Sequence, residues 1–132
     1  MSVLGGIALV LVLGVSLVSS PQEPEPPPGM ATYYVALLRR GPAWTADKTP
    51  EIAKLQEAHL AHIRKMSETG KLIAAGPFLD GGDLRGVFVF NATPEEAKAL
   101  AASDPMVNAG RLALDFHPWW VAEGVMPVAG SR

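Results

Sequence analysis

The chain has 132 residues, enough for one compact domain once an apolar N-terminal stretch is set aside. Its formal charge is −2, but Glu23 and Glu25 lie in a proline-rich segment, and the other eleven of its thirteen acidic residues balance eleven Lys and Arg. A neutral domain without a basic stripe lacks the electrostatic footprint of nucleic-acid binding, and the absence of cysteine excludes disulfides, thiolate nucleophiles and Cys-ligated zinc.

An uncharged apolar run covers residues 3–18. That run is short for a membrane span of about 20 residues and long for a signal-peptide core of about 7 to 15 residues. Small residues follow at Ser16, Ser19 and Ser20, as signal peptidase needs. The residues before the run carry no Lys or Arg, and Pro21 would hinder cleavage directly before it. A signal peptide is favoured over an uncleaved membrane anchor.

Composition divides the chain into four segments. We predict a signal peptide or anchor at residues 1–20, a Pro-rich linker at 21–30, an α+β domain at 31–126 and a flexible tail at 127–132. A cleaved leader predicts a periplasmic or secreted protein, and an uncleaved one predicts membrane attachment through the N-terminal segment alone. The linker sequence PQEPEPPP should sample polyproline II and act as a spacer. Translation from Met30 would instead give a cytosolic domain, and sequencing the mature N-terminus separates these alternatives.

The first strand and helix of the domain are marked clearly. Residues 32–39 (TYYVALLR) are aromatic, β-branched and apolar on both faces, which predicts a central strand. Thr49 suits a helix N-cap, Pro50 suits the first helical position and Gly70 suits the C-terminal end. We therefore expect a helix over residues 50–69.

The second half of the predicted domain carries the same kinds of strand and helix-start signals. Strands are expected at residues 71–77 and 85–91, joined as a hairpin through Asp and Gly residues that tolerate positive φ. The sequence Thr-Pro-Glu-Glu forms a capping box that starts a short helix over residues 94–102. Strict alternation over residues 111–117 predicts a strand with one buried and one exposed face.

The order strand, helix, strand, strand, helix, strand predicts an α+β fold, a ferredoxin-like βαββαβ sandwich with both helices on one face of the sheet. The other face would carry aromatic and aliphatic side chains that a small monomer does not leave in water. We expect two copies to pack sheet to sheet as a symmetric homodimer, a dimeric α+β barrel. The alternative cover for this face is the C-terminal tail from Trp119 onward.

One polar ring interrupts the apolar stripe of the first predicted helix. His59 lies four residues from both Leu55 and Ile63, in the middle of that stripe. It is either a buried structural histidine with both nitrogens satisfied or a functional group. His62, three residues on, could share a metal with it, but two helical histidines without matched carboxylates are weak grounds, and no metal is predicted.

Three other residues could lie near a ligand. Asp104 precedes Pro105 directly after the second predicted helix, which by itself indicates a turn or cap carboxylate. Gly76 and Pro77 end a strand with a backbone that can approach a ligand closely, although such a pair is more often only a strand stop.

The stretch AHLAHIRKMSETGKLIAAGPF, then DP and NAG after a TPEEA helix, resembles the YCII-related family of small dimeric α+β-barrel domains, from about residue 33 to residue 119. Four ordered motifs carry the resemblance: His59-Leu60, Gly70 to Ile73, Ala75 to Pro77 and Asp104-Pro105. The resemblance implies that His59 and Asp104 form the active-site pair in a pocket beside the sheet. Many relatives have a basic residue where this chain has Gln56, and an aromatic one where it has Met106, which implies a more apolar pocket for a less anionic ligand.

Such a pair suits proton transfer, because an imidazole can accept and release protons near neutral pH while a carboxylate fixes its tautomer. We predict a cofactor-independent acid/base enzyme of the lyase, isomerase or elimination type, acting on a small molecule through His59 and Asp104. The alternative is a non-catalytic module, ligand-binding or structural, in which the pair orders the dimer. The expected partners are a second copy and a small molecule, with no nucleic acid.

Overall fold

The structure is a computed structural model that describes residues 1–2, 11, 14, 16 and 21–127. The rest of the predicted leader, and the tail beyond residue 127, lie outside the described residues. Among the residues described, no helix is long and apolar enough to cross a membrane.

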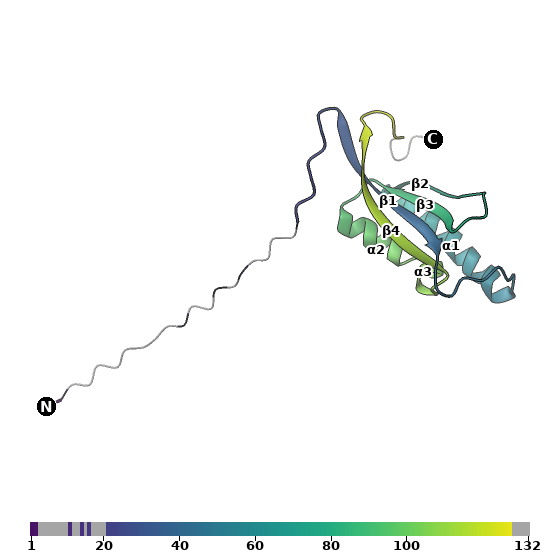
Figure 1. Cartoon of the computed structure of the whole chain (residues 1–132), viewed down its shortest axis with the longest axis horizontal. Coiled ribbons are helices and arrows are strands. Elements are labelled where there is room, and N and C mark those ends of the chain that lie inside the picture. The colour runs from purple at the N-terminus through teal and green to yellow at the C-terminus, as the bar shows by residue number, and fades with distance from the viewer. Residues whose placement is uncertain (3–10, 12–13, 15, 17–20, 128–132) are drawn as a thin grey trace.

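The regular elements are β1 (Met30–Arg40), α1 (Pro50–Glu68), β2 (Leu72–Pro77), β3 (Leu84–Phe90), α2 (Pro94–Ala102), α3 (Pro105–Asn108) and β4 (Leu112–Ala122). The strands form one antiparallel sheet in the order β2-β3-β1-β4, and the helices lie together on one side of it (Figure 1). The predicted ferredoxin-like α+β fold is therefore confirmed, with β1 as a central strand.

The core lies between the sheet and the helices. Alternate residues of β1 point into it, and Phe88 and Phe90 of β3 meet there edge to face with ring centroids 6.0 Å apart. The buried core residues are Tyr34, Ala36, Leu38, Met66, Leu72, Phe88, Phe90, Ala97 and Ala101. Ala97 and Ala101 are small, which lets α2 pack closely against the sheet.

Both long helices begin where their capping signals predict. The Thr49 hydroxyl accepts a hydrogen bond from the backbone N–H of Ile52 at 3.3 Å, which fixes the start of α1. Thr93 and Glu96 form the reciprocal capping box of α2, with distances of 3.2 and 3.3 Å. Gly70, with φ +76°, follows the end of α1.

Two features differ from the predictions. The last strand does not end at His117 but continues through Pro118 to Ala122, because β4 is an edge strand and an edge position can accept a residue without an N–H. Trp119 and Trp120 therefore belong to the sheet, so the alternative of a covering tail that starts at Trp119 is wrong. A one-turn helix, α3, also begins after Asp104, where only a turn or cap was expected.

The linker contacts the domain at one end of the sheet. Glu23 accepts a hydrogen bond from the hydroxyl of Tyr34, and Glu23 and Pro24 line a small cavity with Trp119 and Trp120. Burial and the Glu23 carboxylate raise the pKa of Tyr34 to about 12. The hydroxyl thus stays protonated, and able to donate, throughout the physiological pH range.

The loop between β1 and α1 is fastened to the turn that precedes β4. The N–H of Gly41 donates to the carbonyl of Arg111, and the N–H of Ala43 donates to the carbonyl of Gly110, both at 2.9 Å. A Cβ at position 41 would fall far inside contact distance of the Gly110 carbonyl. Glycine is therefore required at position 41 for close backbone approach.

We expect Gly41→Ala to lower the free energy of unfolding by about 1–3 kcal/mol, because the added methyl must push two backbone segments apart. Equilibrium urea unfolding at a fixed protein concentration measures this change. The matched control is Gly82→Ala in the β2–β3 loop, where the nearest atoms to a Cβ are 3.7 Å away and belong to the Asp80 side chain. Equal losses in the two variants would contradict the prediction.

Candidate functional site

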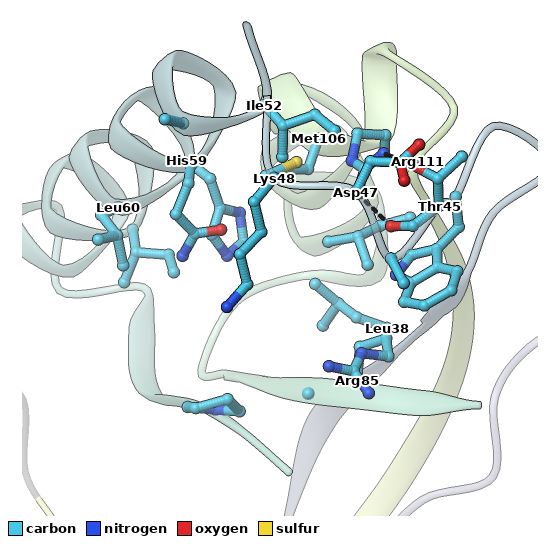
Figure 2. Close-up of a pocket in the computed structure, with 18 of the residues that line it drawn as sticks. Leu38, Thr45, Asp47, Lys48, Ile52, His59, Leu60, Arg85, Met106 and Arg111 are labelled. Carbon is cyan, nitrogen blue, oxygen red and sulfur yellow. Dashed lines mark hydrogen bonds between the residues drawn. The ribbon is translucent and has the colours of Figure 1, made fainter. Parts of the chain in front are cut away.

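A cavity of about 860 Å³ opens between α1, the β1–α1 loop and one end of the sheet (Figure 2). Its apolar lining includes Leu38, Ile52, Leu60, Ile63, Phe88 and Met106. Figure 2 shows His59 and Leu60 projecting from α1 on one side and Leu38 rising from the sheet below. The volume is in the range of about 300–1,000 Å³ that is typical of small-molecule sites.

Three of the four predicted site residues line this cavity: His59, Gly76 and Pro77. A Cβ at Gly76 would meet no atom within 4 Å, but the strand register places that position on the face of Val87 and Leu37, away from the helices. Asp104 does not line the cavity. Its side chain is completely buried behind His59.

His59 and Asp104, 45 positions apart, are in direct contact. Nδ1 of His59 lies 2.6 Å from Oδ2 of Asp104, and their side chains are 13% and 0% exposed. Because an ionised carboxylate only accepts hydrogen bonds, Nδ1 carries the proton in this pair. In the neutral form of the ring, Nε2 is then the unprotonated nitrogen.

The start of α3 holds the carboxylate in place. Asp104 has φ −62° and ψ 129°, an extended conformation that the following proline favours. Its other oxygen, Oδ1, accepts from the backbone N–H of Met106 at 2.8 Å. The carboxylate thus uses one oxygen to cap α3 and the other to orient the histidine.

Nε2 of His59 makes no hydrogen bond to the described part of the chain, and no described buried side-chain nitrogen or oxygen lacks a partner. Nε2 is therefore accessible, and His59 lines the cavity. The ring also stacks on Phe88, with centroids 6.2 Å apart and 27° between the planes. A purely structural histidine would have both nitrogens satisfied.

His62 has a different environment. Its Nε2 donates to the carbonyl oxygen of Leu100 in α2 at 2.8 Å, so this ring fastens two helices together. The structure does not bring His62 and His59 onto a common ligand, and His62 does not line the cavity.

The prediction missed three cations in the cavity wall: Lys48, Arg85 and Arg111. Gln56 lines the cavity and is neutral, as the sequence shows. The cavity nevertheless carries positive charge, because these three cations also line it. No local pattern marks these cations, since they come from the β1–α1 loop, β3 and the turn before β4. Only the topology that joins those segments would have identified them.

The family model of the YCII-related domain matches residues 32–114. The chain belongs to the YCII-related domain family. No curated protein matches it.

Among solved structures, this YCII-related domain is similar to 5-chloro-2-hydroxyhydroquinone dehydrochlorinase (TftG) from Burkholderia phenoliruptrix AC1100, determined in complex with 2,5-dihydroxybenzoquinone. The sequences are 21% identical, the TM-score is 0.47, and the match covers 67% of this chain and 93% of that chain.

We expect Asp104→Asn to invert the tautomer of His59 in the YCII-related domain. The asparagine oxygen would still accept from Met106 N–H, which leaves its amide group to donate to Nδ1 and moves the ring proton to Nε2. Nitrogen-15 NMR of the histidine rings reports which nitrogen is protonated.

His62 is the internal control, because its Nε2–H faces the Leu100 carbonyl and should be the same in both proteins. If the His59 ring showed the same tautomer with Asp or Asn at position 104, the hydrogen bond would not be setting its protonation.

Proposed function

We propose that this YCII-related domain is a cofactor-independent acid/base enzyme of the lyase, isomerase or elimination type that acts on a small molecule. The supporting observation is the His59–Asp104 pair, with Nδ1 bound to a buried carboxylate and Nε2 open to the cavity. A histidine with one ring nitrogen hydrogen-bonded to a carboxylate and the other accessible to a substrate has the arrangement of a general base.

In the proposed reaction, Nε2 of His59 takes a proton from a substrate carbon and the bonding electron pair stays on the substrate. The imidazolium that forms is stabilised by the Asp104 carboxylate, which stays ionised. The same nitrogen then returns the proton to another substrate atom in an isomerisation, or to a leaving group as its bond breaks in an elimination. Apolar side chains form much of the wall around the intermediate.

Gly76 and Pro77 form the sheet side of the proposed site. Both residues line the cavity, so a flat substrate can lie against this end of β2 while its opposite face meets α1. We propose that these two residues bind the ligand through shape and that His59 carries out the chemistry.

We expect His59→Gln to lower kcat/KM by about 10²–10⁴-fold, the usual contribution of a general acid–base group. The assay follows small unsaturated or cyclic compounds in D₂O by proton NMR, where turnover or hydrogen exchange at carbon is visible. His62→Gln is the control, since it removes a histidine from the same helix outside the cavity. Unchanged turnover in His59→Gln would contradict the proposal.

The alternative is a binding or structural module in which the His59–Asp104 pair orders the domain. Complete burial of Asp104 is the observation that favours it. A folded His59→Leu variant that still self-associates would count against a structural role. Binding of small molecules by wild type and His59→Gln alike, with no turnover in either, would support a binding module.

We further propose that two copies pair through the helix-free face of the sheet. Tyr33, Val35 and Leu37 alternate with the core residues of β1 and so point away from the helices, where they are only half-buried. The β1–β3 register sets Val35 opposite Val89 on this face, which extends the apolar surface across strands. A second copy would cover these side chains with an identical surface.

We expect the wild-type chain to have twice its monomer mass in size-exclusion chromatography with light scattering, and Val35→Lys to be monomeric because a buried ammonium would have no partner. Leu79→Lys in the β2–β3 loop is the control, since Leu79 is 93% exposed and lies outside the sheet. A monomeric wild type, or equal dissociation of both variants, would contradict the proposal.

A further inference from the structure

The cavity wall carries unbalanced positive charge. Its ionisable lining consists of Lys48, Arg85 and Arg111 against the single carboxylate of Asp47, besides His59 itself. The ion pairs of the described chain join Arg39 to Asp83 and Asp115, and Lys71 to Glu96. None of the three cavity cations forms an ion pair in the part of the chain that the structure describes.

The three cations differ in what holds them. Arg111 donates to the carbonyl and hydroxyl oxygens of Thr45 at 2.9 and 3.2 Å, so it fastens the β1–α1 loop. Arg85 donates one hydrogen bond to the carbonyl of Gly82 at 3.2 Å, which leaves most of its five N–H groups unused. All these acceptors are neutral, so neither guanidinium has its charge compensated.

Lys48 is the least restrained of the three. It belongs to the β1–α1 loop directly before the Thr49 cap, and no hydrogen bond or salt bridge within the described residues involves its ammonium. Figure 2 shows its side chain extending from that loop into the space between α1 and the sheet, and His59, which also lines the cavity, projecting from α1. Its ammonium is therefore available to a molecule that enters.

The surroundings strengthen the effect of these charges. Apolar side chains form much of the wall, and charge is screened less in a partly enclosed apolar cavity than on an open surface. The N-terminal end of α1 is also at the cavity, since Thr49 and Pro50 line it, and it adds partial positive charge. The cavity thus combines an apolar body with a cationic edge.

We propose that Lys48 and Arg85 bind the carboxylate of a small organic anion, and that this anion is the substrate class of the site. The inference rests on the function proposed above and names the ligand that His59 would act on. The apolar body of the anion packs on Leu38, Ile52 and Phe88, while its carboxylate meets the two cations. The same cations offset negative charge that develops on the substrate when His59 removes a proton.

The test compares two probes of equal shape, benzoate and its neutral analogue benzamide, titrated into the full-length protein and followed by NMR. We expect benzoate to bind roughly tenfold more tightly than benzamide, and Lys48→Ala and Arg85→Ala each to weaken benzoate binding roughly three- to tenfold with little effect on benzamide. Lys48→Arg should restore the preference because it keeps the charge.

Lys54→Ala is the matched control, because Lys54 is an exposed cation on α1 that does not line the cavity. It changes net charge as Lys48→Ala does, so it reports any non-specific electrostatic effect. Equal affinity for the two probes, equal losses in Lys48→Ala and Lys54→Ala, or no binding of benzoate at millimolar concentration would each overturn the inference.

The two proposals fail in different ways. Loss of turnover in His59→Gln with no preference for benzoate would leave the acid/base function standing and remove the anion site. A clear preference for benzoate with unchanged turnover in His59→Gln would leave an anion-binding domain without the proposed chemistry.

Discussion

The buried carboxylate of Asp104 is the constraint on which the candidate site depends. An ionised group that is completely removed from water must have its oxygens satisfied, and here the backbone of α3 satisfies one and the ring of His59 satisfies the other. The position of α1 is thereby tied to the turn where α3 begins. A shift of either element would leave a buried charge without a partner, which costs several kcal/mol.

The rest of the fold makes that geometry rigid. The core fixes α1 and α2 on the sheet, His62 joins those two helices through the Leu100 carbonyl, and Phe88 supports the flat side of the His59 ring. The loop that closes the cavity is held separately, by backbone hydrogen bonds of Gly41 and Ala43 to the turn before β4. Histidine and cavity wall are therefore positioned by independent sets of contacts, as a preorganised site requires.

Local signals predicted most of the elements. Helix caps join residues that are close in the sequence, as Thr49 and Pro50 do for α1 and the Thr93–Glu96 box does for α2. The starts of α1 and α2 could therefore be predicted from the sequence. The last strand was predicted from alternation over residues 111–117 and continues through Pro118, which an edge strand accepts, and edge position is a property of the sheet rather than of the residue. The pairing of His59 with Asp104 followed from family resemblance, since no periodicity connects a helix to a turn 45 residues later. The three cations of the cavity wall were not predicted for the same physical reason. They are far apart in the sequence and line one cavity only after the chain has folded.

The contact between Glu23 and Tyr34 has a consequence for the segment that precedes the domain. A polyproline spacer extends about 3.1 Å per residue, so the seven steps from Glu23 to Met30 would otherwise add roughly 20 Å of reach. Glu23 is instead fastened to a tyrosine hydroxyl that stays protonated up to a pKa of about 12, so the chain contacts the domain at that point. The spacer therefore reaches less far from the domain than its length suggests, because it is fastened to the domain at Glu23, beside Trp119 and Trp120.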